Sequence, residues 1–238
     1  MRIEDRTRRA PNVKELLKPI PIIGDLAKRI YWSLFARSRP FPGSAAYWEQ
    51  RYSAGGNSGV GSYALFAQFK AEVLNTFVGT HHVDTVIDFG CGDGNQLTLA
   101  TYPSYLGFDV SRTAISQCQA RFKSDPHKAF RLMADYNGET ADLALSLDVI
   151  YHLVEDAVFE HYMRKLFEAS NRYVIIYASD SDDNRGNEGT HVRHRQFTKW
   201  VRENLSQWSL MEHLPNRYPY RGDYRTGSFA EFFIYEKP

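Results

Sequence analysis

Several features that would assign a chain to a particular class of protein are scarce or missing from this sequence of 238 residues. It has only two cysteines, Cys91 and Cys118, with no C-x-x-C pair and no histidine at zinc-finger spacing, so neither a disulfide framework nor a structural zinc site is expected. Its 29 basic and 28 acidic residues nearly cancel, which gives no reason to expect a nucleic-acid partner. No apolar run is long enough to span a membrane, and the first residues lack the apolar core of a secretory signal. We therefore expect a cytoplasmic protein.

The most informative stretch is TVIDFGCGDGNQL, residues 85–97. Its apolar part suits a buried parallel strand. The glycines that follow let the backbone turn sharply and approach a ligand without a Cβ in the way: Gly90, Gly92 and Gly94. This pattern is typical of a nucleotide-cofactor loop at the carboxyl edge of a sheet, although such a turn can also simply connect a strand to a helix.

Two common nucleotide loops do not fit this stretch. A G-x-G-x-x-G dinucleotide fingerprint would need its third glycine at the position of Asn95. The G-x-x-x-x-G-K-[ST] phosphate loop fails because no Lys-Ser or Lys-Thr follows the glycines. Nicotinamide binding and ATP hydrolysis are therefore disfavoured.

The stretch resembles the first motif of the class I S-adenosylmethionine-dependent methyltransferases, in which an acid, here Asp88, precedes the glycine turn by two residues. That family places a second acid at the end of the next strand, and YLGFDVS supplies Asp109 there. The resemblance implies S-adenosylmethionine as cofactor, with Asp109 at its ribose hydroxyls by the logic of dinucleotide folds. Neighbours of the two motifs complete the first part of the predicted cofactor site: Gly90, Cys91, Gly92, Gly94, Asn95, Gln96 and Val110.

Strand and helix patterns alternate after this motif, which predicts a parallel sheet covered on both faces. Two late strands, near 208–214 and 230–235, match the antiparallel seventh strand of the family. We expect an α/β, Rossmann-like, doubly wound fold with a mostly parallel seven-stranded sheet, an antiparallel last strand and an N-terminal helical extension. The predicted domains are the extension at 1–44 and a methyltransferase domain at 45–238.

The N-terminal part has two further patterns. Residues 13–32 mix leucine and isoleucine with lysine and arginine in an amphipathic stretch broken at Pro19 and Pro21. The stretch favours an extra helix packed on the domain, and the alternative is a peripheral contact with the inner face of a membrane or with a glycosyltransferase. The run YWEQRY, residues 47–52, resembles an element found ahead of the cofactor loop in many such methyltransferases, and a glycine-rich loop follows it. Together they predict a lid.

Residues that follow the third and fourth strands are candidates for the site, because ligands of doubly wound sheets lie at the carboxyl ends of the strands. The resemblance implies that Asp135, with Tyr136, meets the adenine, although a turn aspartate is the alternative. It also implies that Leu147 and Asp148 line the cofactor and that His152 points into the active site. A histidine there is a candidate general base toward a substrate hydroxyl, because its pKa lies near working pH.

Acids and histidines cluster again after the fifth strand. Asp182 and Asp183, together with Asp148, could bind a divalent cation as in some sugar methyltransferases, or they could form a solvated acidic turn. His191 and His194 lie three apart, and either could be the base in place of His152. Asp148 and these three histidines are the predicted catalytic residues.

The sequence gives the least information about the acceptor of the methyl group. The stretch NRYPYRGDYRTG, residues 216–227, interleaves three tyrosines and three arginines, which suit sugar rings or bases and phosphates or carboxylates. The whole chain, including its HVRHRQF run, resembles bacterial methyltransferases associated with surface-polysaccharide assembly. We therefore expect O-methylation of a sugar hydroxyl on a glycan or sugar nucleotide. Open alternatives are O- or N-methylation of a small metabolite or natural product, and a noncatalytic cofactor-binding partner of a glycosyltransferase.

Overall fold

The computed structural model describes residues 41–185 and 189–238, and the amphipathic stretch 13–32 lies outside them. Gly43–Pro238 form one compact unit. Within the described ranges, no helix combines the length and the apolar character needed to cross a membrane.

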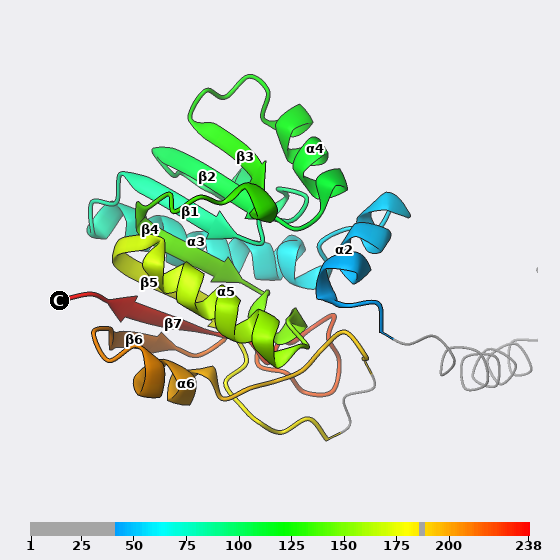
Figure 1. Ribbon diagram of the computed structural model, residues 1–238, viewed down its shortest axis with the longest axis vertical. Helices are drawn as coiled ribbons and strands as arrows, with labels where there is room; N and C mark the ends of the chain where they lie inside the picture. The colour runs from blue at the N-terminus through cyan, green and yellow to red at the C-terminus, as the bar shows by residue number, and fades with distance from the viewer. Residues whose placement is uncertain (1–40, 186–188) are drawn as a thin grey trace, which may run out of the picture. The chain divides into compact units, whose positions relative to one another are not determined.

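The core of this unit is a seven-stranded sheet with the strand order β3-β2-β1-β4-β5-β7-β6 (Figure 1). Strands β1 to β5 run parallel to one another, whereas β7 is antiparallel to both β5 and β6. The predicted Rossmann-like fold with an antiparallel last strand is confirmed. The strands are β1 Thr85–Phe89, β2 Ser104–Asp109, β3 Lys128–Leu132, β4 Ala141–Leu147, β5 Ser170–Ala178, β6 Ser209–Leu214 and β7 Glu231–Glu236.

Helices cover both faces of the sheet because successive residues of the central strands are buried on opposite sides. Val86 of β1 belongs to the apolar cluster under α3 and α4, and its neighbour Ile87 belongs to the cluster under α5 and α6. Strands buried on both faces are continuously apolar, which is why β1, β4 and β5 could be predicted from the sequence. The helices are α2 Ser44–Ser53, α3 Ala64–Thr80, α4 Arg112–Arg121, α5 Asp156–Glu168 and α6 Phe197–Asn204.

The strand order reverses at β1, which pairs with β2 on one side and β4 on the other. The chains leaving β1 and β4 diverge there and open a crevice at the carboxyl edge of the sheet. The loop after β1 is fixed in this crevice, because Gly90 N and Cys91 N both donate to the Phe108 carbonyl oxygen, at 2.7 and 3.0 Å. The fold therefore places the glycine turn beside the end of β2.

Candidate cofactor and active site

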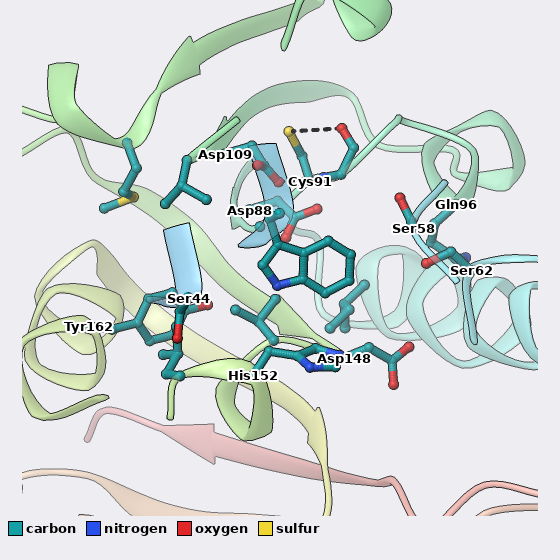
Figure 2. A pocket seen from close by; sticks show the side chains of 18 of the residues that line it. Ser44, Ser58, Ser62, Asp88, Cys91, Gln96, Asp109, Asp148, His152 and Tyr162 are labelled. Atoms are coloured by element: carbon teal, nitrogen blue, oxygen red, sulfur yellow. Dashed lines mark hydrogen bonds between the residues drawn. The ribbon is translucent and has the colours of Figure 1, made fainter. Parts of the chain in front are cut away.

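A pocket lies in this crevice, and Figure 2 shows its polar side chains facing one another from several elements. Its floor comes from the ends of β1, β2 and β4, and its cover comes from α2 and the residues that follow it. Of the residues proposed from the sequence, those that line the pocket are Asp88, Gly90, Cys91, Gly92, Gln96, Asp109, Val110, Leu147, Asp148 and His152.

The glycine turn adopts positive φ angles, which residues with a Cβ rarely adopt. Gly90, Gly92 and Gly94 have φ values of 97°, 59° and 73°. A Cβ on Gly90 would lie 2.4 Å from Val149 Cγ2, and one on Gly92 would lie 2.4 Å from Ser58 Oγ. The turn can thus come close to both a ligand and its cover. Gly94 is outside the pocket lining, and its missing side chain makes room for α4, since a Cβ would meet Cys118 Sγ at 2.9 Å.

Two buried acceptor atoms in the pocket wall have no hydrogen-bond partner among the described residues: Asp88 Oδ1 and Gln96 Oε1. The rest of each group is satisfied, because Tyr105 donates to Asp88 Oδ2 at 2.7 Å and Gln96 Nε2 donates to the Ala67 carbonyl at 3.0 Å. Burial raises the pKa of Asp88 to about 7. Buried polar atoms without partners are costly. Both atoms therefore fit a ligand that brings hydrogen-bond donors.

Asp109 ties the end of β2 to the glycine turn. Its two carboxylate oxygens accept from Gly92 N at 2.9 Å and from Ser111 N at 2.8 Å. Burial raises its pKa to about 6. Each oxygen keeps a further lone pair, so the carboxylate can still accept hydrogen bonds from a diol.

An apolar slot begins next to Asp109. Val110 is 44% exposed and Val158 is 43% exposed although both are apolar, and both line the pocket. Met133 and Leu153 complete this part of the wall. Exposed apolar side chains that converge on one cavity suit a flat, weakly polar ring.

Helix α2 covers the pocket and is fastened on two sides. Glu49 accepts from Ser111 Oγ and Thr113 Oγ1, both at 2.7 Å, at the start of α4. Ser44 Oγ donates to Glu155 Oε2 at 2.6 Å, beside the start of α5. Trp48, between these contacts, lines the pocket.

Asp93 fastens the glycine-rich residues after α2 to the glycine turn, a role that the sequence reasoning missed. Its Oδ2 accepts from Ser58 N at 3.0 Å and from Tyr63 OH at 2.8 Å. Asn95, a predicted cofactor residue outside the pocket lining, adds to this attachment because its Nδ2 donates to the Ser62 carbonyl at 2.8 Å. We call residues 54–63 the cover loop.

A buried ion pair forms the opposite wall. Asp148, directly after β4, has a φ of 60°, and its Oδ2 lies 2.6 Å from Lys70 Nζ. Tyr151 OH donates to its other oxygen at 2.8 Å. Lys70 comes from α3 and is fully buried, with Tyr177 beneath it at 5.3 Å. The cover loop approaches this pair so closely that a Cβ on Gly61 would lie 2.7 Å from Asp148 Oδ2.

His152 lies in the pocket with a defined tautomer. Its Nδ1 is 2.9 Å from the His191 carbonyl oxygen, and because a carbonyl only accepts, Nδ1 must carry the proton and Nε2 the lone pair. Burial lowers the pKa of His152 to about 4, so the ring is neutral at pH 7. Trp48 packs edge-on against it at 4.9 Å.

A family model described as a methyltransferase domain matches residues 62–219, well over half of the chain. This chain belongs to that family. The match spans the glycine turn, both acids and the buried ion pair, and it confirms that the protein is a methyltransferase.

Solved methyltransferases share the fold. The N-methyltransferase NodS from Bradyrhizobium japonicum WM9, in complex with S-adenosyl-L-homocysteine, is 14% identical over 82% of this chain and 98% of that chain, with a TM-score of 0.62. Magnesium protoporphyrin IX methyltransferase ChlM from Synechocystis PCC 6803, with bound S-adenosylmethionine, is 14% identical over 84% and 100%, with a TM-score of 0.59. The methyltransferase domain of bacterial CtHen1-C is 20% identical over 71% and 97%, with a TM-score of 0.56. No curated protein matches the sequence.

The other two candidate bases of this methyltransferase lie outside the pocket lining. His191 is stacked between Tyr47, at 4.5 Å, and His152, at 5.4 Å. His194 Nδ1 lies 2.6 Å from Ser179 Oγ, and its ring packs against Phe229 at 4.6 Å. His191 therefore positions His152, and His194 packs behind the pocket lining against Tyr151 and Phe229.

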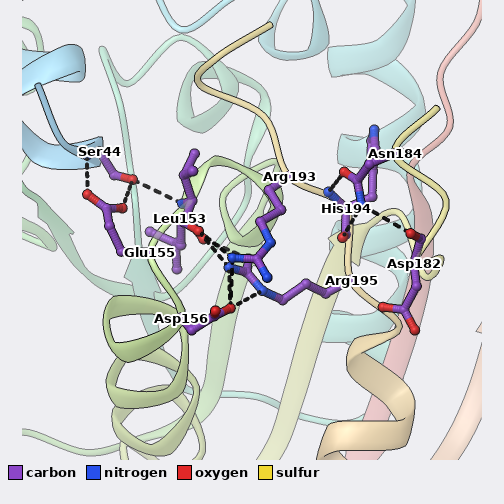
Figure 3. Close-up of polar contacts among 10 residues, drawn as sticks. Ser44, Leu153, Glu155, Asp156, Asp182, Asn184, Arg193, His194 and Arg195 are labelled. Atoms are coloured by element: carbon purple, nitrogen blue, oxygen red, sulfur yellow. Dashed lines mark hydrogen bonds and ion pairs between the residues drawn. The ribbon is translucent and has the colours of Figure 1, made fainter. Parts of the chain in front are cut away.

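The predicted cation site is not formed. Asp148 points inward to Lys70, whereas Asp182 accepts from Gln196 N at 2.9 Å and Asp183 pairs with the exposed Arg185 at 2.7 Å. Figure 3 shows Asp182 on the outer loop after β5. Across 41–185 and 189–238, no three histidine, cysteine or acidic side chains are grouped so as to bind a metal ion.

The residues proposed for the adenine lie elsewhere than expected. Asp135 is exposed at the end of the short turn Met133–Asp135 and does not line the pocket. Tyr136 packs beneath the site, 5.1 Å from Phe89 and 5.5 Å from Phe108. Met133, the first residue of that turn, lines the pocket instead.

Proposed function

We propose that this protein is an S-adenosylmethionine-dependent O-methyltransferase that methylates a sugar hydroxyl of a glycan or sugar nucleotide. The observation with most weight is the pair of acids at the ends of β1 and β2, which flank a positive-φ glycine turn. Among the described residues, Asp88 Oδ1 and Gln96 Oε1 beside this turn have no hydrogen-bond partner. A ligand with an ammonium group, a ribose diol and an adenine ring satisfies each part of this wall.

The pocket residues divide into parts that fit the cofactor. Asp88 Oδ1 and Gln96 Oε1 would accept from donors of its polar end. Asp109 would accept from the ribose hydroxyls, and the slot that begins at Val110 would hold the adenine. S-adenosylmethionine supplies an electrophilic methyl group on a sulfonium that leaves as a neutral thioether.

The chain's own contribution is positioning, proton removal and exclusion of water. His152 Nε2 has the free lone pair in the pocket, so it accepts the proton of the acceptor hydroxyl as the new C–O bond forms. Asp148 is held in place by Lys70 and Tyr151, which makes its carboxylate a fixed negative group beside the developing imidazolium. Helix α2 and the cover loop shield this side from solvent.

Support for a sugar acceptor comes from the tyrosines and arginines of residues 216–227 and from the resemblance to polysaccharide-modifying enzymes. Tyrosine faces pack on sugar rings, and arginines bind the phosphates or carboxylates that many activated or acidic sugars contain. We place the reaction in the cytoplasm, with residues 13–32 contacting a membrane surface or a glycosyltransferase. Sedimentation of the full chain with anionic vesicles, with and without Lys14→Glu, Lys18→Glu and Lys28→Glu, tests the membrane contact.

A labelled-methyl assay tests the function. The protein is incubated with methyl-labelled S-adenosylmethionine and a panel of glycans, sugar nucleotides and small hydroxyl and amine metabolites. Label in a sugar O-methyl group, lost in Asp109→Ala and kept in Asp125→Ala, is expected, because Asp125 lies outside the pocket. Label only in a nonsugar metabolite, or in no acceptor at all, would reject the sugar assignment; the second result favours a noncatalytic role.

A further inference from the structure

The residues between β6 and β7 form a loop held by specific hydrogen bonds, which we call the aromatic loop (residues 216–229). Asn216 is buried at its start, and its Nδ2 donates to Tyr177 OH at 2.6 Å and to the Ala230 carbonyl at 2.7 Å. Within the loop, Tyr220 N donates to the Ser228 carbonyl at 3.0 Å. The Asn216 contacts fix the start of the loop against β5 and the residue before β7, and the Tyr220 contact joins the two arms of the loop.

Two tyrosines of this loop are stacked on each other at the surface. The ring centroids of Tyr220 and Tyr224 are 4.6 Å apart with an angle of 28° between the planes. They remain 39% and 53% exposed, so the stack does not serve to bury them. Phe229 lies 6.0 Å from Tyr224 and nearly perpendicular to it. The loop thus presents a preorganised aromatic surface, which loses little conformational entropy when it binds a ring.

The same loop has positive charge that no acidic side chain of the described residues neutralises. Arg217 pairs with Glu72 at 2.7 Å. The side chains of Arg221 and Arg225 are exposed and have no hydrogen-bond or ion-pair partner among the described residues. The loop's one acid, Asp223, accepts from the Arg225 backbone N–H at 2.9 Å. Two guanidinium groups that the described residues leave unpaired, beside stacked tyrosines, favour a ligand that combines a ring with an anionic group.

Aromatic side chains connect this surface to the acceptor side of the pocket. Phe229 lies 5.1 Å from Tyr151 and 4.6 Å from His194. Tyr151 OH in turn donates to Asp148, which lines the pocket. The loop enters β7 at the carboxyl edge of the parallel strands, since the start of β7 pairs with the end of β5 (Figure 1). The residues at the ends of β1, β2 and β4 that line the pocket lie at the same edge. A ligand on the loop could therefore extend toward His152.

We propose that the aromatic loop is an acceptor-binding subsite for a saccharide that carries a phosphate or carboxylate group. A sugar ring stacks on the Tyr220–Tyr224 pair, and Arg221 and Arg225 bind the anion. This inference rests on the proposed function, since it names the class of acceptor at the same site.

Paired acceptors test the inference and separate the two sources of anion. UDP-glucose is compared with glucose, and an oligogalacturonate with its carboxyl-reduced, neutral counterpart. Binding to the protein saturated with S-adenosyl-L-homocysteine is measured by calorimetry, and KM and kcat are measured wherever methyl transfer occurs. We expect the wild type to prefer one anionic member over its neutral counterpart, with an affinity that falls as salt rises.

The variants are Arg221→Gln with Arg225→Gln, and Tyr224→Ala, with Arg202→Gln on α6 as the matched surface control. We expect the double arginine variant to raise Kd and KM for the anionic saccharide about ten-fold or more. Its kcat, its S-adenosyl-L-homocysteine affinity and its binding of the neutral counterpart should not change. Tyr224→Ala should weaken both members of a pair.

The possible failures can be told apart. Anionic binding that depends on the loop, without methyl transfer to any sugar, contradicts the proposed function and keeps the subsite. Sugar methylation with equal Kd in wild type and the double arginine variant overturns the subsite and keeps the function. Absence of binding to every anionic saccharide also overturns the subsite.

Discussion

Lys70 on α3 is fully buried and lies 2.6 Å from the carboxylate of Asp148, which follows β4 with a positive φ of 60°. The two residues are 78 positions apart in the chain. A left-handed aspartate persists only where its surroundings fix it, and strain of this kind concentrates at functional sites. The pair thus joins the stability of the core to the shape of the acceptor side of the pocket.

Removing Lys70 should cost stability as well as activity. Lys70→Met leaves the largely buried Asp148 carboxylate without its cation, which in other proteins costs about 3–5 kcal/mol. We expect a loss of this size in the free energy of unfolding measured with urea. Adding Asp148→Asn, which tolerates the left-handed backbone and has no charge, should restore part of the loss. A double variant no more stable than Lys70→Met would contradict the ion-pair account.

Cofactor affinity should depend on the ionisation of Asp88. Its pKa of about 7 means that the free protein is mostly protonated there at pH 6 and mostly ionised at pH 8. The ligand needs an acceptor at Oδ1, so binding favours the ionised form, and affinity should rise with pH up to about 7 and then level off. Between pH 6 and 8 we expect about a ten-fold lower Kd for S-adenosyl-L-homocysteine.

The matched variant for this pH effect is Asp88→Asn, which keeps the size of the side chain but cannot ionise. Calorimetry should show weaker binding with a much flatter pH dependence, and the proton release seen in the wild type should disappear. If the affinity of Asp88→Asn for S-adenosyl-L-homocysteine kept the pH dependence of the wild type, the proton released on binding would come from another group.

Loss of the proposed base should affect turnover more than binding. His152→Gln should lower kcat by about 10²- to 10⁴-fold, the range typical of general bases, with little change in S-adenosyl-L-homocysteine affinity. Since the pKa of His152 is about 4, its acid limb in kcat/KM should lie near pH 4. His191→Asn keeps the backbone carbonyl that holds Nδ1, so its effect should be smaller. A His152→Gln enzyme with wild-type kcat would remove the base assignment.

Two glycine substitutions should affect different properties, namely cofactor release at Gly61 and stability at Gly79. Gly61→Ala places a Cβ 2.7 Å from Asp148 Oδ2, which should displace the cover loop and increase the off-rate of the cofactor in stopped-flow measurements. Gly79→Ala lies in α3 with open space around it and no positive φ, so it should stabilise the protein by about 0.5–1 kcal/mol. Cofactor kinetics unchanged in Gly61→Ala would show that the cover loop is not part of the cofactor site.

The fold was legible from the sequence because its signals are local. The apolar run that became β1 and the positive-φ glycines are patterns of a few neighbouring residues. The two acids at strand ends were also placed in the pocket as predicted, because parallel strands end at one edge.

The rest of the site depends on contacts between distant segments. Lys70 is the one charged residue on the buried face of α3, and only its approach to Asp148 explains its burial. Asp93 gains its role from the cover loop 35 residues earlier. Asp182 was expected near Asp148, but its loop turns outward, where Gln196 N occupies its carboxylate. The spacing of residues in the sequence does not show in which direction a loop turns or which distant segment it meets.

The most direct test of the account is the position of the labelled methyl group after turnover with wild-type protein and the paired sugar acceptors. We expect label in an ether-linked methyl of an anionic saccharide, identified by mass spectrometry of the hydrolysed sugar, and its loss in both Asp109→Ala and His152→Gln. Label found on nitrogen, or sugar methylation that persists in Asp109→Ala, would contradict it.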